Sequence, residues 1–123
     1  MQQLSPAGLV EIFKTYRYQH GSEVDFQRGI EEVLRRHDIT FLREHQLGPA
    51  YGRIDFYIPN HKYGVELKVK GSPSEVLRQL HRYAQCPDIT ALILITGRRR
   101  LAFAPMNING RPLLTASLWD AQF

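Results

Sequence analysis

The sequence has little of what marks a secreted, membrane-spanning or metal-cluster protein. Its one cysteine, Cys86, can form neither an internal disulfide nor a cysteine-based metal cluster. No apolar run is long enough to cross a bilayer, and the first residues lack the basic segment and apolar stretch of a secretion signal. There is also no low-complexity tract and no repeat. These absences predict a cytoplasmic globular protein that does not associate with membranes.

The composition predicts one ordinary globular domain over residues 1–123. Of these residues, 43% are hydrophobic and 23% are charged, which suits a single hydrophobic core. The formal net charge is +4 and the pI is about 9.5. This basic character favours a polyanionic partner, because Lys and Arg side chains that contact phosphates release counterions. It does not decide the matter alone, since many basic proteins bind no nucleic acid.

Hydrophobic spacing and capping residues predict three helices. An amphipathic helix is expected over residues 6–16. A second begins at Ser22, whose hydroxyl can cap the first turn with Asp25 as its partner, and ends near residues 35–37. A third begins at Ser72, where a proline and Glu75 follow as in a capping box, and ends near residue 85.

Four strands and a less regular end complete the expected fold. Strands are predicted over residues 40–47, 51–58 and 63–69, and the apolar run 90–96 is typical of a central strand covered on both faces. Residues 100–123 are expected to form short strands or an extended tail, with a turn at Asn109-Gly110. The predicted fold is therefore α/β or α+β, with a mixed central β-sheet flanked by helices.

Two neighbouring strands carry the residues with the clearest chemistry. Glu66 and Lys68 alternate with apolar residues, so both side chains should lie on one face of their strand. Asp55 stands between Ile54 and Phe56 and is expected to face away from both. If the two strands pair as a hairpin, Asp55 and Glu66 converge beside Lys68. The alternative is structural: Asp55 can pair with a nearby cation, and the other two can be solvated.

This grouping has the chemistry of a hydrolytic magnesium site. Two carboxylates are hard oxygen ligands, and Mg²⁺ fills its remaining positions with water and substrate phosphate. The ion lowers the pKa of a bound water and neutralises charge on the phosphate. An adjacent lysine can orient or deprotonate the attacking water, or stabilise the transition state.

The spacing is also that of a known family. Asp55, ten intervening residues and then Glu66-Leu67-Lys68 resembles the PD-(D/E)xK nuclease superfamily, which includes Holliday junction resolvases, restriction endonucleases and phage exonucleases. The resemblance covers residues 22–96 and implies a restriction-endonuclease-like core in the order α-β-β-β-α-β. It implies a DNA phosphodiesterase that uses Mg²⁺, with Mn²⁺ as a substitute, held by Asp55, Glu66 and the backbone carbonyl of Leu67. Ile54 departs from the family pattern, which has a proline there.

Two accessory positions also match that family. An acidic residue on the preceding helix often reaches the metal, and Glu23 fits this position on the inward face of its helix. A glutamine often follows on the next helix, where Gln79 would support Lys68 or contact the DNA backbone. Glu44, one strand earlier, can either join the site or remain a surface residue of an edge strand.

Several cations are candidates for DNA contacts. Arg98, Arg99 and Arg100 follow the central strand and form either a phosphate clamp or a solvated loop, while Arg53 and Lys70 flank the candidate site. The alternative function is a catalytically inactive module with a nuclease fold that binds DNA or protein. The complete Asp, Glu and Lys set argues against it.

The small size suggests a resolvase-like or stand-alone phage or repair nuclease, which recognises DNA structure or ends rather than sequence. Cutting two strands in concert needs two sites, so a homodimer is expected. The alternative is that the C-terminal strands complete the sheet and the chain works alone. The apolar surface proposed for the dimer comprises Leu101, Phe103, Pro105, Met106, Leu113, Leu114 and Trp119.

Overall fold

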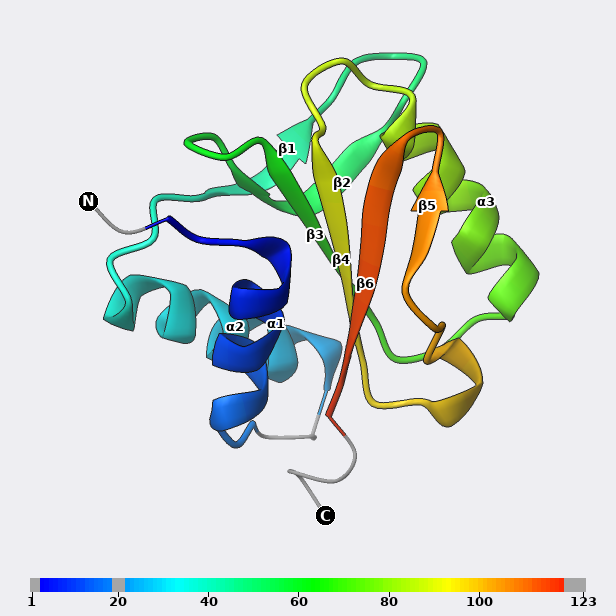
Figure 1. Cartoon of the computed structure of the whole chain (residues 1–123). Helices are drawn as coiled ribbons and strands as arrows, with labels where there is room; N and C mark the ends of the chain where they lie inside the picture. Colours follow the sequence, from blue (N-terminus) through cyan, green and yellow to red (C-terminus); the bar gives the residue numbers. More distant parts are fainter. Residues whose placement is uncertain (1–2, 19–21, 119–123) are drawn as a thin grey trace.

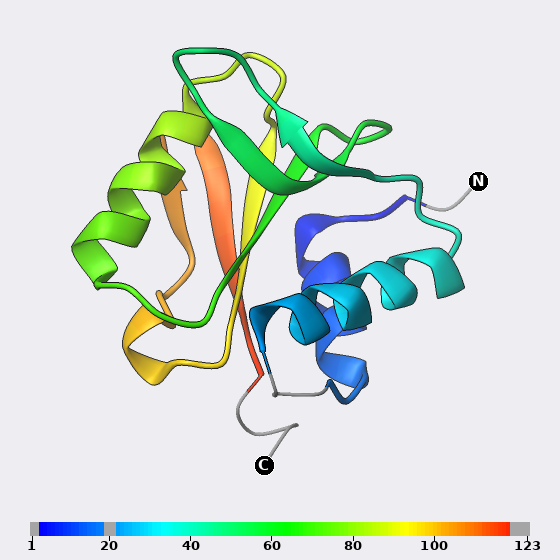
Figure 2. The same cartoon turned by 180° about the vertical axis from the view of Figure 1, so that it is seen from behind.

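Helices cover both faces of a six-stranded mixed β-sheet (Figure 1). The computed structural model describes residues 3–18 and 22–118. Helices α1 and α2 lie on one face of the sheet and α3 lies on the other, as Figure 2 shows from behind. The helices are α1 (Pro6–Thr15), α2 (Glu23–Arg36) and α3 (Pro73–Ala84).

The predicted helix starts are confirmed at atomic detail. Ser22 Oγ accepts a hydrogen bond from the Asp25 amide at 3.1 Å at the start of α2. Ser72 and Glu75 form a complete capping box at the start of α3. These side chains satisfy amides that have no partner inside the helix, which fixes where each helix begins.

The sheet order is β1-β2-β3-β4-β6-β5. The first three strands form an antiparallel meander, and α3 then crosses over to β4, which runs parallel to β3. From α2 to β4 the elements follow the predicted order α-β-β-β-α-β. The strands are β1 (Leu42–Gln46), β2 (Arg53–Ile58), β3 (Tyr63–Lys68), β4 (Ala91–Thr96), β5 (Met106–Ile108) and β6 (Arg111–Ser117).

The C-terminal segment extends the sheet rather than trailing from it. After the short helix η1 (Arg99–Leu101), β5 and β6 form a hairpin whose two-residue loop is Asn109-Gly110. Both loop residues have positive φ, 51° and 80°, as a type I′ turn requires. β6 runs parallel to β4, so β4 has a neighbouring strand on each side. All six residues of β4 are buried, which confirms the predicted central strand.

The two faces of the strand pair β1–β2 exchange sides of the sheet part-way along the strands. Phe56 packs in the core beneath α1 and α2, whereas Ile54, two residues earlier, packs in the core beneath α3. The prediction that Asp55 faces away from both neighbours is therefore wrong, because those neighbours lie on opposite faces. Gly64 leaves room for this change, since a β-carbon there would lie 2.5 Å from Ile54 Cδ1.

Strand β1 makes the same exchange of faces at Glu44. Arg43 lies over the Phe56 ring, while His45 stacks on Tyr57, whose ring belongs to the opposite core. Between them Glu44 has a φ of 47°, a left-handed conformation that is unfavourable for residues other than glycine. This exchange releases Asp55 from the regular sheet.

The left-handed backbone of Glu44 gives a stability test. Replacing an L-residue by glycine at such a φ relieves roughly 1–2 kcal/mol, against a smaller entropy cost of about 0.5–1 kcal/mol. We expect Glu44→Gly to leave the free energy of unfolding unchanged or to raise it by up to about 1 kcal/mol. Glu32, an exposed glutamate inside α2, is the matched control. Glu32→Gly should lower stability by about 1 kcal/mol in urea titrations. Equal losses at both positions would contradict the assigned strain.

Candidate active site

Asp55 and Glu66 bridge β2 and β3 where the backbone pairing of these strands ends. The ladder runs from Ile58–Tyr63 to Phe56–Val65 and stops there. Beyond it, Asp55 Oδ2 accepts a hydrogen bond from the Leu67 amide at 2.9 Å. Glu66 Oε1 accepts one from the Asp55 amide at 3.1 Å. Each carboxylate thus holds the backbone beside the other, and the predicted convergence of the two residues is confirmed.

Lys68 lies next to this pair. Its Nζ is 3.6 Å from Glu66 Oε2, and the two side chains are 29% and 5% exposed, respectively. A carboxylate this deeply buried needs a nearby cation or a proton. Lys68 supplies a cation on one side only, so the site combines a buried Glu66 and a half-buried Asp55 with a partly exposed ammonium group.

The electrostatics of the pair favour uptake of a positive charge. Burial, followed by the Asp55 charge, raises the pKa of Glu66 to about 8, while Lys68 opposes the shift. Burial also raises the pKa of Asp55, against the hydrogen bond from the Leu67 amide. Burial and mutual repulsion thus disfavour the state in which both carboxyl groups are ionised. A proton or a divalent cation can relieve that repulsion.

Glu23 lies at the rim of the site. Figure 2 shows the first turn of α2 beside the end of β3, and the Glu23 charge contributes to raising the Asp55 pKa. The side chain is exposed. Within residues 3–18 and 22–118, no three His, Cys, Asp or Glu side chains are close enough together to hold a metal ion. The carboxylates brought together in this structure are therefore Asp55 and Glu66, and the Glu23 charge acts on Asp55 from the rim.

Helix α3 brings Gln79 to Lys68. The two residues line one pocket of about 200 Å³, together with Lys70, Gly71, Glu75 and Val76. Glu75 is turned toward the helix cap, since its Oε1 accepts hydrogen bonds from the amide and hydroxyl of Ser72. The lysines consequently dominate the charge of this pocket.

Tyr83 is a residue of the site that the sequence analysis did not assign. Its buried hydroxyl donates to the Arg53 carbonyl at 2.8 Å. Burial raises its pKa most, and the Glu66 and Asp55 charges raise it further. It lies four residues after Gln79 on the inward stripe of α3, and this spacing was the available signal. Tyr83 therefore forms part of the wall behind the carboxylates.

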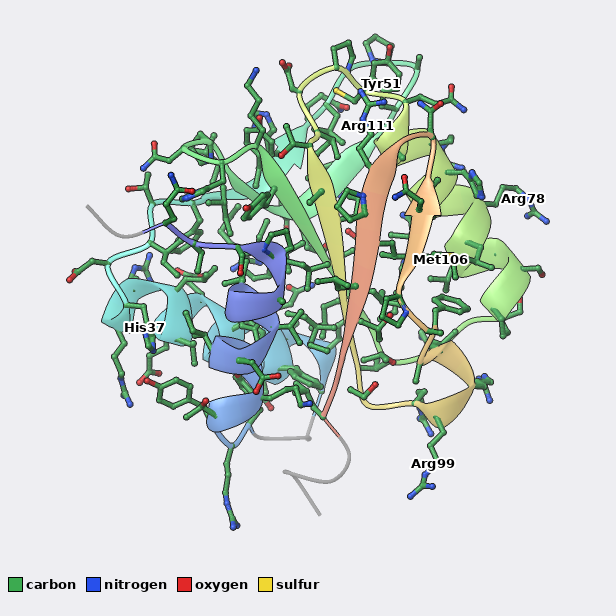
Figure 3. The ribbon with its side chains drawn as sticks, in the orientation of Figure 1. His37, Tyr51, Arg78, Arg99, Met106 and Arg111 are labelled. Carbon is green, nitrogen blue, oxygen red and sulfur yellow. The ribbon has the colours of Figure 1, made fainter. Side chains whose placement is uncertain are left out.

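The predicted arginine cluster lies against the loop that follows β3. Arg98 Nε donates to the Val69 carbonyl at 2.6 Å, and Arg100 Nε donates to the Gly71 carbonyl at 3.3 Å. These bonds fasten η1 beside Lys70, although all four basic side chains stay exposed. Arg99 projects away from the sheet (Figure 3). Arg53 is also exposed, with Nη1 3.6 Å from Glu44 Oε1.

Glu44 is a partner of arginines rather than of the carboxylate pair. Its side chain is 53% exposed and lies within 4 Å of Arg43 and Arg53, at 3.8 and 3.6 Å. This matches the surface alternative for Glu44.

The apolar surface predicted for a homodimer is wrong. Leu101 and Leu113 are fully buried, and Phe103 and Met106 pack against the core beneath α3. Leu114 packs against the core on the other face, Pro105 is exposed, and Trp119 lies outside the described residues. The η1–β5–β6 segment uses these side chains to complete its own sheet. In the described part of the chain, the large exposed hydrophobic side chains are Val24 and Leu42.

Comparison with known proteins adds no assignment. No family model, curated protein or solved structure matches the chain. Among the described residues, no helix has both the length and the apolar character needed to span a bilayer. A functional proposal must therefore rest on the site itself.

The raised pKa of Glu66 predicts how stability depends on pH in the metal-free protein. Between its ordinary pKa of 4.5 and about 8, the folded carboxyl keeps a proton that the unfolded one loses. Stability should consequently fall as pH rises through this interval, by at most about 1.4 kcal/mol per pH unit for one proton. Glu66→Gln removes this contribution and should give a flatter profile. Urea unfolding of both proteins in EDTA over a series of pH values measures the difference, because the remaining titratable groups are common to the two. Parallel profiles would contradict the shift.

Proposed function

We propose that this protein is a Mg²⁺- or Mn²⁺-dependent nuclease of the PD-(D/E)xK type that hydrolyses phosphodiester bonds in DNA. The observation that carries the proposal is the interlocked Asp55–Glu66 pair with Lys68 beside it. Few structural needs explain a buried Glu66 carboxylate beside a half-buried Asp55 carboxylate, each bound to a backbone amide next to the other, since such burial is unfavourable without a cation. A hydrolytic metal site explains both the burial and the neighbouring ammonium group.

The metal would be held by Asp55, Glu66 and the backbone carbonyl of Leu67, with Glu23 as a further carboxylate from the rim. This set fits Mg²⁺, which prefers a few carboxylate oxygens and keeps several waters. When bound, the ion supplies a water of lowered pKa and neutralises charge on the phosphate. The bridging hydrogen bonds hold the two carboxylates in place before any ion arrives, which avoids reorganisation on binding.

Lys68 and Gln79 would act on the substrate side. The Lys68 ammonium can orient the attacking water or stabilise the charge that builds on the phosphate. Gln79 lines the same pocket and can hold the Lys68 side chain or contact the DNA backbone. Lys70, which lines the pocket, and the three exposed arginines of residues 98–100 beside it extend the positive surface along which a DNA strand would lie.

The cations support recognition of DNA structure or ends, as in resolvase-like nucleases, because phosphate contacts carry no direct base information.

A homodimer would hold two sites for paired cuts, but the C-terminal face expected to form it is used in the core. Dimerisation would therefore need another face of the protein.

Branched, duplex and single-stranded DNA, each incubated with Mg²⁺ and with EDTA, test the activity and the substrate class together.

Variants of the three central residues should separate metal binding from chemistry. Asp55→Ala and Glu66→Ala should lose both Mg²⁺ binding and cleavage. Asp55→Asn keeps the shape of the bridge and should lose them with less loss of stability. Lys68→Ala should still bind Mg²⁺ and DNA but cleave about 10²–10³-fold more slowly.

Calorimetry with Mg²⁺ and single-turnover cleavage give the two readouts for these variants. Glu32→Gln, on the exposed side of α2, is the control and should behave as the unchanged protein. Near-normal cleavage by Glu66→Ala would exclude this site as the catalytic centre.

The arginine cluster predicts a steep dependence of DNA affinity on salt. Replacing Arg98, Arg99 and Arg100 together by glutamine should flatten the slope of log K against log salt by about one for each phosphate that the variant no longer neutralises. Arg99→Gln alone leaves the bonds of its neighbours to the loop intact and should produce part of the effect. Arg36→Gln, on exposed α2, removes one charge and is the charge-matched control for Arg99→Gln. If the triple variant and this control give the same slope, the cluster does not contact DNA.

A further inference from the structure

Arg43 connects the edge strand β1 to helix α2. Its Nη1 donates to Glu31 Oε1 at 2.6 Å, and its Nη2 donates to Gln27 Oε1 at 3.1 Å. The guanidinium carbon lies 4.8 Å from the centre of the Phe56 ring, and the side chain is 31% exposed. Two hydrogen bonds and a ring contact hold this planar group in one orientation.

The connection continues from Gln27 to the rim of the site. Because the Gln27 oxygen accepts from Arg43, its NH₂ group is turned the other way along the helix. There Nε2 donates to Glu23 Oε2 at 3.5 Å, one turn closer to the helix start. The Glu23 carboxylate is close enough to Asp55 for the two charges to interact. A chain of three side chains thus runs from β1 to the Asp55–Glu66 pair.

Arg43 is linked to the Glu23 carboxylate through the uncharged Gln27 amide. Glu31 carries the balancing negative charge for Arg43 and also pairs with Arg35. The second arm of the guanidinium is directed to the Gln27 amide, although Glu44 Oε2 lies 3.8 Å from the same nitrogen. If Arg43 served only to anchor α2, the pair with Glu31 would suffice.

We propose that Arg43 is a positioning residue of the metal site, which fixes the Gln27 amide so that it holds the Glu23 carboxylate toward Asp55 and thereby raises the affinity for Mg²⁺. This inference rests on the proposed function. Groups that orient a ligand from behind commonly change metal affinity about 10–100-fold when they are removed.

The sign of the effect separates positioning from a direct effect of charge. A cation near the site repels Mg²⁺, so direct electrostatics alone predicts that Arg43→Met binds the ion more tightly. Positioning predicts that it binds more weakly, by roughly tenfold. Gln27→Met replaces one neutral side chain by another and should weaken binding to a similar extent. It leaves the Arg43–Glu31 pair intact, so it tests the proposal even if Arg43→Met fails to fold.

The experiment measures Mg²⁺ affinity by calorimetry and by the thermal stabilisation that the ion gives each variant. A double-mutant cycle with Glu23→Gln is decisive, because Arg43→Met should have little further effect once the carboxylate is gone. Arg36→Met is the matched control. Arg36, on α2 itself, pairs with Glu32 of that helix and lies over the Tyr16 ring, so it makes the same two kinds of contact as Arg43 but none with Gln27 or Glu23 that the structure records.

The outcomes are distinct. Weaker binding by Arg43→Met and Gln27→Met that disappears in the Glu23→Gln background supports the proposal. Unchanged or tighter binding by both variants overturns it, as does an equal loss with and without Glu23, while Mg²⁺ binding by the unchanged protein leaves the proposed function standing. Absence of Mg²⁺ binding by the unchanged protein overturns the proposed function and this inference together.

Discussion

The reciprocal bridge between Asp55 and Glu66 is the interaction on which the site depends. Two adjacent antiparallel strands normally satisfy their amides with each other's carbonyls. Here the strands separate after Phe56–Val65, and the amides of Asp55 and Leu67 turn to carboxylates instead. The separation requires β2 to leave the regular pleat, which it does together with β1 at Glu44. A strained residue on an edge strand thus makes the geometry of the central pair possible.

This arrangement lowers the stability of the fold, because it gathers two acidic side chains in one partly buried place. Burying Glu66 and Asp55 together is unfavourable, and Lys68 and Arg43 offset the Asp55 charge only in part. The rest of the domain supplies the compensation, since β4 is buried along its full length and α3 begins with a complete capping box. Such a division is common in enzymes, where a rigid core supports a locally unfavourable site.

Local signals predicted the elements, and longer-range packing decided the rest. Ser22, Ser72 and the run 90–96 act through neighbouring residues or through simple periodicity, so the sequence was sufficient to locate them. The spacing from Asp55 to Glu66 predicted their convergence, because a hairpin leaves few alternatives. The exchange of faces in β1 and β2 could not be predicted, since a glutamate at positive φ has no sequence signature. The fate of Leu101 and Leu113 depended on the β5–β6 hairpin, which only the complete sheet reveals.

The site therefore has a fixed part and an adjustable part. Asp55 and Glu66 belong to strands and hold each other through backbone amides, so neither can move without breaking a hydrogen bond to a central strand. Glu23 belongs to the first turn of a helix, is exposed, and is held by one long hydrogen bond from Gln27. A carboxylate held in this way keeps more freedom than the strand pair, and the Arg43–Gln27 contact limits that freedom. Asp55 and Glu66 would define where an ion binds. Glu23 on α2 would influence how tightly the ion is bound.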